Sequence, residues 1–399
     1  MLTPTEAERL IGENLARRPA ESLPLVQCAG CVLRESISAE RDQPPFDRVA
    51  MDGIALASPA LASGLRSFRI QGMQPAGDPP SLLEEPGACI EVMTGAVLPI
   101  GCDAVIPVEQ LSVVDGEAHL AAGLGVEPWQ NIHRRGTDTR AGTLLLNPGL
   151  RLGAPEIAIA ASAGMARIRV ASPPAIAVIS TGNELIEPGE ALLPHQVRRS
   201  NAYGIVAALK GRGFQRVADD HVRDDLKALN ARLKFHLDTH DVLVLSGGVS
   251  MGRLDLVPRA LADLCVHTVF HKVAQRPGMP LWFGVASSGV AVFALPGNPV
   301  STLVCVARYV VPALFAMMGE APREPETMAL GAPVTVKQPL ALFMPVRIEN
   351  DDSGRAWAIP RPTNGSGDFT ALAGTDGFVE LPPGPKTYPK AFVTRLHRW

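Results

Sequence analysis

The sequence predicts a multidomain α/β plus β protein whose central α/β domain has a mostly parallel sheet. Three observations support this prediction. The 399 residues are enough for two to three domains of about 150 residues each. From about residue 173 to residue 320, continuous apolar runs alternate with helical patterns, as they do around a parallel sheet that is buried on both faces. The segment from Pro44 to about Asp138 and residues 321–399 contain short apolar runs broken by turn residues, which is typical of β modules.

The composition indicates a folded protein without a strong overall charge. Apolar residues make up 46% of the chain and the formal net charge is −3, so disorder is excluded and no global field attracts nucleic acid or an anionic membrane. The N-terminus lacks the basic and apolar pattern of a signal peptide. We also expect no apolar run of about 18 residues, the length that spans a bilayer. We therefore expect a cytoplasmic protein with no nucleic-acid or membrane partner.

The first predicted element is a helix that begins at Thr3, because Thr3, Pro4 and Glu6 form a capping-box pattern. Near residue 154 a second helix is predicted, followed by a basic strand that ends before the double proline at 173–174.

Cys28 and Cys31 form a CxxC pattern in an apolar stretch. A zinc ribbon would need a second cysteine pair at a suitable spacing, and the chain has none. We therefore interpret both residues as buried, inert thiols. We interpret two histidine pairs as surface or strand-edge residues: His236/His240 and His267/His271.

The central domain is expected to contain strands at residues 175–180, 241–245 and 290–295, each of which is a continuous apolar run. The predicted helices are one capped by Ser200 and Asn201, one carried by Leu226, Leu229 and Leu233, and one from Val300 to Met318.

Each of these three strands ends in a loop of small residues, at 180–182, 246–248 and 296–298. Glycine lets the backbone approach a ligand closely, and helix N-termini after such loops bind anions. In an open parallel sheet, ligands bind beyond the carboxyl ends of the strands. Three such loops predict a phosphate-bearing or oxyanion ligand at this edge.

Acidic residues lie in or close to the same loops, namely Glu184, Asp224, Asp225 and Asp255. Carboxylates beside an anion site are explained if Mg²⁺ bridges them to phosphate. Alternatively, these aspartates cap and charge the first turns of helices. The GxSxG pattern at 248–252 allows a serine hydrolase, but a hydrolase would leave the other loops and the carboxylates without a role.

Seven ordered motifs resemble those of one known family. They are PFDRVAMDG at 45–53, VMTGA followed by LPIGCDAV at 92–105, RRGTD at 134–138, STGNEL at 180–185, SGGVS at 246–250, LPGNPVS at 295–301 and GSG at 365–367. In this order they are similar to the motifs of the molybdopterin molybdotransferases, whose eukaryotic relative is the C-terminal part of gephyrin. The similarity runs along nearly the whole chain.

The resemblance implies four domains: domain I at 1–42 plus 140–172, an inserted β-rich domain II at 43–139, an α/β domain III of the molybdopterin-binding type at 173–320, and a C-terminal β domain IV at 321–399. It also implies a homodimer whose site lies between domain III of one subunit and domain II of the other. The implied enzyme inserts molybdenum from molybdate into adenylated molybdopterin in molybdenum cofactor biosynthesis, releases AMP and uses Mg²⁺. A molybdopterin adenylyltransferase is a possible partner.

Carried over residue by residue, the resemblance implies two groups of site residues. The catalytic residues would be Asp52, Thr94, Glu184, Asp224 and Asp255, with Asp224 and Asp255 as metal ligands. The substrate-binding residues would be Thr181, Gly182, Ser246, Gly247, Gly248, Ser250, Lys272, Arg276, Pro296, Gly297, Asn298 and Pro299.

The chain departs from the family pattern at a few positions. Arg48 and Val49 replace an Asn-Ser pair, Arg199 replaces an aspartate, Met279 replaces a lysine and Leu256 replaces a frequent aromatic residue. These changes in charge leave open whether the oxyanion is molybdate or tungstate.

Two other functions stay open. A molybdopterin adenylyltransferase or a nucleotide pyrophosphatase would use the α/β domain alone, and such an enzyme would not need Asp52 and Thr94. A gephyrin-like scaffold would bind a partner peptide, and it would not need the carboxylates of the α/β domain.

Overall fold

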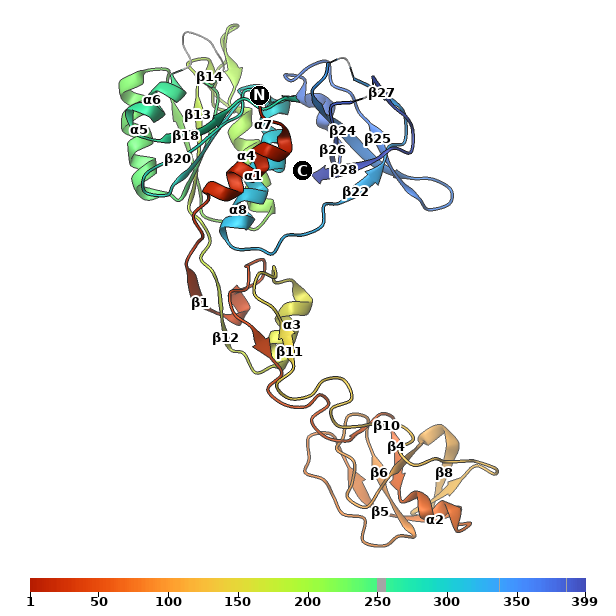
Figure 1. The fold of residues 1–399 in the computed structure, drawn as a ribbon. Coiled ribbons are helices and arrows are strands. Elements are labelled where there is room, and N and C mark those ends of the chain that lie inside the picture. Colours follow the sequence, from red (N-terminus) through yellow and green to blue (C-terminus); the bar gives the residue numbers. More distant parts are fainter. Residues whose placement is uncertain (250–255, 337, 385) are drawn as a thin grey trace. The chain divides into compact units, whose positions relative to one another are not determined.

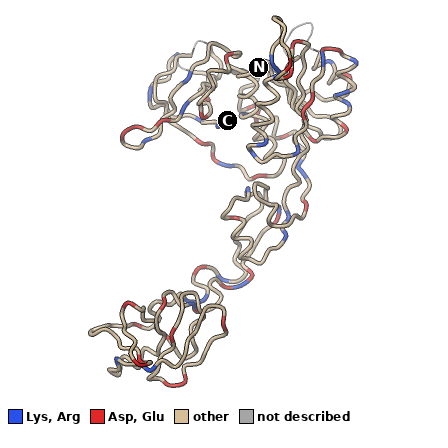
Figure 2. The backbone as a smooth tube through the Cα atoms, turned by 180° about the vertical axis from the view of Figure 1, so that it is seen from behind, with Lys and Arg blue, Asp and Glu red and all other residues tan. Residues whose placement is uncertain are grey.

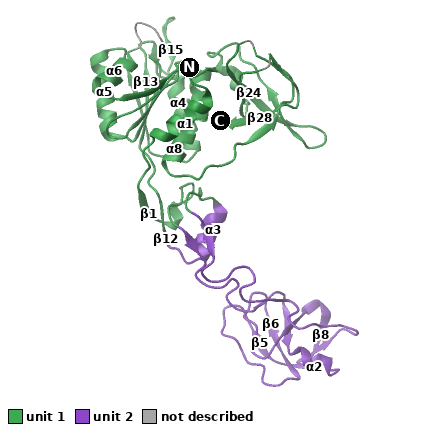
Figure 3. Ribbon diagram, viewed as in Figure 1, with its two compact units in different colours: residues 1–35, 148–153, 167–399 green, residues 36–147, 154–166 purple. Residues whose placement is uncertain are grey.

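The computed structural model describes residues 1–249, 256–336, 338–384 and 386–399. The chain forms two compact units (Figure 3): unit 1 contains residues 1–35, 148–153 and 167–399, and unit 2 contains residues 36–147 and 154–166. Positively and negatively charged residues are interspersed along the backbone within each unit (Figure 2).

A six-stranded sheet forms the centre of unit 1, with the strand order β16-β13-β17-β21-β20-β18 (Figure 1). The four neighbouring strands β16, β13, β17 and β21 are parallel to one another. In contrast, β20 is antiparallel to β21, and β18 is antiparallel to β20. The bounds are β13 Ile176–Thr181, β16 Val217–Val222, β17 Val242–Ser246, β18 His267–His271, β20 Trp282–Val285 and β21 Ala291–Leu295. Every residue of β13, β17 and β21 is buried. The mostly parallel sheet expected from the apolar runs is therefore confirmed.

Helices cover both faces of this sheet. One hydrophobic core joins the sheet to α1, α4 and the segment from α7 to α8, and a second core on the opposite face joins it to α5 and α6. The bounds are α1 Pro4–Asn14, α4 Ser200–Gly211, α5 Leu226–Thr239, α6 Val257–Asp263, α7 Pro299–Cys305, the π-helical η3 Val306–Val310 and α8 Val311–Met317.

Two of the predicted helix starts are confirmed and a third is wrong. In the capping box of α1, Glu6 N donates to Thr3 Oγ1 over 3.2 Å, and Thr3 N donates to Glu6 Oε2 over 2.7 Å. Asp225 caps α5, since its Oδ1 accepts a backbone N–H of the first turn at 2.7 Å. Ser200 and Asn201 do not cap α4: they are its first two residues, and the side chain of Arg199 at the N-cap position forms no capping hydrogen bond.

The segment Pro299–Met317 is long and apolar enough to cross a membrane by length and composition, with a mean hydropathy of 1.8. The expectation that no run reaches this length is therefore wrong. However, 78% of the apolar window is buried inside the protein, so the segment is a core helix that packs on the central sheet.

Cys28 is buried as expected, whereas Cys31 and one histidine differ from the expectation. Burial raises the pKa of Cys28 to about 11 and also raises the pKa of Cys31, which is only partly buried. Both thiols are therefore protonated and unreactive at neutral pH. His236 is not a surface residue: it is 3% exposed, and its Nε2 lies 2.7 Å from Asp220 Oδ2. The described residues contain no cluster of three or more metal-ligating side chains.

The C-terminal part of unit 1 is the expected β module. One sheet has the order β19-β24-β26-β28-β22, with β25 paired to β24, and β23 pairs with β27. The bounds are β19 Gln275–Arg276, β22 Thr327–Ala329, β23 Val334–Thr335, β24 Ala341–Asn350, β25 Ala356–Pro360, β26 Gly377–Leu381, β27 Thr387–Tyr388 and β28 Val393–Arg398. Because β19 belongs to the loop after β18, its parallel pairing with β24 links the α/β domain to this module.

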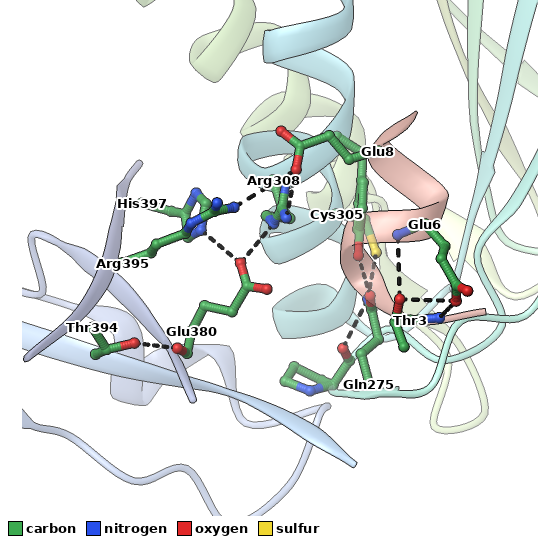
Figure 4. A network of polar contacts seen from close by, with 12 residues as sticks. Thr3, Glu6, Glu8, Gln275, Cys305, Arg308, Glu380, Thr394, Arg395 and His397 are labelled. Carbon is green, nitrogen blue, oxygen red and sulfur yellow. Dashed lines mark hydrogen bonds and ion pairs between the residues drawn. The ribbon is translucent and has the colours of Figure 1, made fainter. Parts of the chain in front are cut away.

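A buried polar network also holds the module in place (Figure 4). Arg308 of η3 is 1% exposed and donates to Glu380 Oε2 of β26 over 2.8 Å and to Glu8 Oε2 of α1 over 3.0 Å. His397 of β28 lies 3.0 Å from the same Glu380 oxygen. Burial alone would lower the pKa of Arg308, but the carboxylates of Glu380 and Glu8 outweigh it and raise the pKa. The guanidinium is therefore charged and is matched by carboxylates from two other elements.

A short ribbon completes the N-terminal part of unit 1. In it, β1 Ala20–Pro24 pairs antiparallel with β12 Arg167–Ala171, so residues near 20 and near 170 lie side by side.

Unit 2 contains a six-stranded sheet of its own, with the order β7-β4-β6-β5-β9-β8. Its elements are β2 Ile37–Ser38, β3 Arg48–Val49, β4 Gly53–Leu56, α2 Ser58–Ala62, β5 Ser67–Gln74, β6 Ala88–Val92, β7 Ala104–Pro107, β8 Leu111–Val114, β9 Glu117–Leu120, β10 Ile132–His133, β11 Leu144–Leu146 and α3 Ala154–Ser162. Successive residues of β4 belong to different cores: Ile54 and Leu56 to one, and Ala55 to the other. The sheet is thus covered on both faces, and the β-rich character expected for this region is confirmed.

Candidate active site

Three neighbouring strands of the central sheet end at one edge of unit 1. The register pairs Ser180 at the end of β13 with Ser246 at the end of β17, and Ser246 with Leu295 at the end of β21. The loops that follow these residues therefore meet, as the sequence predicts for parallel strands. They surround a cavity of about 930 Å³, which we call the main cavity.

Most of the expected site residues of the α/β domain line the main cavity. They are Thr181, Gly182, Glu184, Asp224, Ser246, Gly247, Gly248, Pro296, Gly297, Asn298 and Pro299. Ser250 and Asp255, which were also expected here, lie outside the described residues. Lys272 does not line this cavity or the second cavity described below, and Arg276 lines only the second.

Gly247 is required by the close approach of two strand ends. Its φ is +100°, and a Cβ atom there would lie 2.6 Å from the carbonyl oxygen of Thr181. Only glycine allows the loop after β17 to touch the end of β13 in this way.

Two buried hydroxyls at the end of β13 have no hydrogen-bond partner among the described residues. They are Ser180 Oγ and Thr181 Oγ1, and their residues are 1% and 5% exposed. Both residues line the main cavity. Since a buried polar atom normally has a partner, a polar ligand atom in the cavity is the natural partner for these hydroxyls.

Asp224 has a different role from its neighbour Asp225. Asp224 Oδ2 accepts a hydrogen bond from Asn183 N at 3.2 Å, and Asn183 Oδ1 accepts one from Asp224 N at 3.2 Å. Only Asp225 caps α5. The alternative that both aspartates serve the helix is therefore wrong for Asp224, which instead fixes the loop after β13.

Two further residues hold the loops and were missed from the sequence. Asn201 Nδ2 donates to Ser246 Oγ at 2.9 Å and to Gly297 O at 2.8 Å, so it ties the loops after β17 and β21 to α4. His221 Nε2 lies 2.9 Å from Gly182 O. His221 is brought to the site because β16 pairs with β13 and places His221 opposite Ser180. The sequence does not show that these two strands are neighbours, so this role could not be predicted from it.

A second cavity of about 680 Å³ adjoins the main cavity, and the two share Pro280, Pro296 and Asn298 in their walls. Asn298 Nδ2 donates to Ser366 Oγ at 2.8 Å, so the GSG motif of the C-terminal module reaches this boundary. The sequence did not assign this motif to the site, but Gly367 lines the main cavity, and Gly365 and Ser366 line the second cavity.

Three family models match successive parts of the chain. The MoeA N-terminal region (domain I and II) matches residues 2–164, a probable molybdopterin binding domain matches residues 177–316, and the MoeA C-terminal region (domain IV) matches residues 327–390. A molybdopterin molybdenumtransferase of Synechocystis is 38% identical to the chain over 371 residues, which are 93% of this chain and 93% of the relative. The chain belongs to the MoeA family.

Further comparisons agree with membership of the MoeA family. A molybdopterin molybdenumtransferase of Synechococcus elongatus is 34% identical, with 96% of each chain covered. The crystal structure of a molybdopterin biosynthesis protein from Pyrococcus horikosii has a TM-score of 0.78 at 29% identity, and it covers 100% of this chain and 99% of that one. The resemblance drawn from the motifs is thus confirmed, and the chain is identified as an enzyme of the MoeA family.

In unit 2, the structure brings together the two residues that the MoeA resemblance singles out there. Asp52 Oδ1 accepts hydrogen bonds from Thr94 N at 2.6 Å and from Thr94 Oγ1 at 2.7 Å. These bonds lower the pKa of Asp52, so its carboxylate is ionised. Nearby, Arg48 NH2 lies 3.0 Å from His133 Nδ1 and Val49 is buried, so these two departures from the MoeA pattern have local contacts of their own.

Arg199, where the MoeA pattern has an aspartate, is neutralised within unit 1. It forms ion pairs with Glu187 at 2.5 Å and with Asp219 at 2.6 Å. Its hydrogen bonds to Asp219 are the largest cause of a raised pKa. Arg199 therefore does not replace the charge that is lost at Met279, which lines the second cavity.

Proposed function

We propose that the chain transfers molybdenum from molybdate to adenylated molybdopterin and releases AMP, as one step of molybdenum cofactor biosynthesis. The observation that supports this most strongly is the convergence of three small-residue loops, two partnerless hydroxyls and two carboxylates on one cavity of about 930 Å³. This volume suits a large organic ligand, and the N-terminus of α4 at the cavity wall suits a phosphate. The names of the relatives support the same reaction.

We infer that Asp224 helps to hold Mg²⁺ at the main cavity, with Asp255 as a second expected ligand. The donor set fits, because Asp224 Oδ2 is the oxygen that accepts from Asn183 N, and Oδ1 forms no hydrogen bond or ion pair with the described residues. Mg²⁺ commonly takes one or two carboxylates together with phosphate oxygens and water. When bound, it would neutralise charge on the phosphate groups.

The chain's own residues would orient the substrate. The hydroxyls of Ser180 and Thr181 can each donate to a ligand oxygen, which removes the cost of leaving them unpaired. Asn201 and His221 keep the three loops in the arrangement that these contacts need. Glu184 lies in the same wall and supplies a carboxylate beside the reacting phosphates.

The function is tested by AMP release from adenylated molybdopterin in the presence of molybdate and Mg²⁺. Asp224→Asn should lower the rate at least tenfold and raise the Mg²⁺ concentration needed for half-maximal activity, because the amide is a poorer Mg²⁺ ligand than a carboxylate. Asp225→Asn is the matched control, since asparagine caps a helix as well as aspartate does. Normal turnover of Asp224→Asn at the same Mg²⁺ concentration would refute the assigned metal role, and no AMP release by the wild type would refute the function.

We also propose a homodimer in which domain II of one subunit completes the site of the other. Asp52→Ala and Glu184→Ala chains, each inactive alone, should then recover activity when mixed, since a twofold heterodimer has one site that retains both residues. The measurement is AMP release, with heterodimers verified by native mass spectrometry. Mixing Asp52→Ala with an Asp52→Ala/Glu184→Ala chain should give no recovery. Heterodimers without activity in the first mixture would contradict a shared site.

The proposal carries two further expectations, a cytoplasmic location and a molybdopterin adenylyltransferase as a possible partner. The choice between molybdate and tungstate is tested in the same assay by supplying each oxyanion separately.

A further inference from the structure

We infer that Arg198 is the phosphate-binding cation of the main cavity, an inference that rests on the proposed function. It belongs to the β14–β15 segment (residues 185–198), in which β14 Leu185–Ile186 pairs with β15 Val197–Arg198. Among the described residues, Arg198 and Arg199 are the cationic side chains that line the cavity. They follow one another in the chain, yet their surroundings differ completely.

Arg199 cannot serve a ligand, because it is 5% exposed and its guanidinium is occupied by Glu187 and Asp219. Arg198, in contrast, is exposed. Within the described residues it forms no ion pair, and its one hydrogen bond is from NH1 to the carbonyl oxygen of Glu187, at 2.7 Å. A guanidinium has five N–H donors, so most donors of Arg198 are available to a ligand.

The neighbouring contacts hold Arg198 in place. Arg199 N donates to Ile186 O at 3.0 Å, and the Arg199 side chain anchors Glu187, whose carbonyl in turn holds the Arg198 guanidinium. A positioned guanidinium loses less freedom when it binds and suits the geometry of phosphate. The buried arginine therefore acts as the support for the exposed one.

The charges on the cavity wall also favour a second cation beside the proposed Mg²⁺. Its described wall carries the carboxylates of Glu184 and Asp224, which repel a phosphate. Arg198 supplies an unpaired positive charge on the same wall. This makes it a determinant of specificity for an anionic nucleotide over a neutral nucleoside.

The test compares the affinities of AMP and adenosine for the full-length protein. Arg198→Ala and Arg198→Gln should weaken AMP binding about tenfold or more, the size of a lost charge-assisted hydrogen bond. Adenosine binding should change less than about twofold, and Arg198→Lys should keep most of the AMP affinity because it keeps the charge. Arg216→Ala is the matched control: this exposed arginine also donates to one backbone carbonyl, of Pro173 at 3.2 Å, and it lies before β16, at the opposite end of the parallel strands.

Three results would overturn the inference. They are equal AMP affinities of the Gln and Lys variants, equal losses for AMP and adenosine, and a wild type without preference for AMP. The first two would mean that Arg198 only supports the β14–β15 segment. Failure of the proposed function is seen separately, as a wild-type protein that does not release AMP from adenylated molybdopterin.

Discussion

Replacing Arg308 by methionine is expected to lower the free energy of unfolding of unit 1 by about 3–5 kcal/mol, the usual cost of removing one partner of a buried ion pair. The guanidinium is 1% exposed and stands between Glu380 and Glu8. Without it, the carboxylate of Glu380, whose side chain is 11% exposed, keeps His397 as its one partner among the described residues. Methionine fills much of the volume of the arginine side chain. The decrease in the free energy of unfolding therefore reports the uncompensated charge of Glu380 rather than a cavity.

Urea unfolding followed by tryptophan fluorescence measures this effect. The measurement is best made in a Trp129→Phe background, because the other three of the four tryptophans (Trp282, Trp357 and Trp399) lie in unit 1. Arg9→Met is the control: it removes an exposed pair with Glu13, whose side chains are 58% and 52% exposed, and should cost less than about 0.5 kcal/mol. Equal losses in the two variants would show that the buried network does not stabilise the fold beyond an ordinary surface pair.

The Arg308 network illustrates what the sequence cannot show. Its members come from α1, η3 and β26, and no spacing or periodicity relates Glu8 or Glu380 to an arginine near residue 308. The pairing of Arg199 with Asp219 is similar, since it depends on β16 lying beside β13. Such contacts are set by strand order, which local patterns do not contain.

The position of the site could be predicted because it depends on local features. Continuous apolar runs marked β13, β17 and β21, and small residues marked their carboxyl ends, which a parallel sheet brings to one edge. The antiparallel strands β18 and β20 were not predicted. His267–His271 has polar residues at three of its five positions, and Trp282–Val285 has only four residues and contains a glycine, so neither is a continuous apolar run like the three predicted strands. Asn201 was assigned to a helix cap by its residue type, whereas its amide instead connects the loops after β17 and β21.

The second large effect is expected at Gly247, where replacement by alanine should slow AMP release about a hundredfold. The added Cβ would lie 2.6 Å from the Thr181 carbonyl oxygen and 3.0 Å from Thr181 Oγ1, so the loop after β17 must move away from the end of β13. Both loops line the main cavity, and a displacement of about 1 Å in a catalytic site can cost a hundredfold in rate.

Gly213→Ala is the control for Gly247→Ala. It introduces the backbone strain of alanine at a positive φ without the clash between two strand ends. The φ angles of Gly213 and Gly247 are +97° and +100°, but a Cβ at Gly213 would lie more than 4 Å from its neighbours in the described part of the chain. Both variants bear the strain of a left-handed alanine, about 1 kcal/mol, and only Gly247→Ala forces the two strand ends apart. AMP release per mole of folded protein, with the folded fraction taken from urea unfolding, should therefore fall only in Gly247→Ala. Equal rates in the two variants would show that the contact between these strand ends does not shape the reacting site.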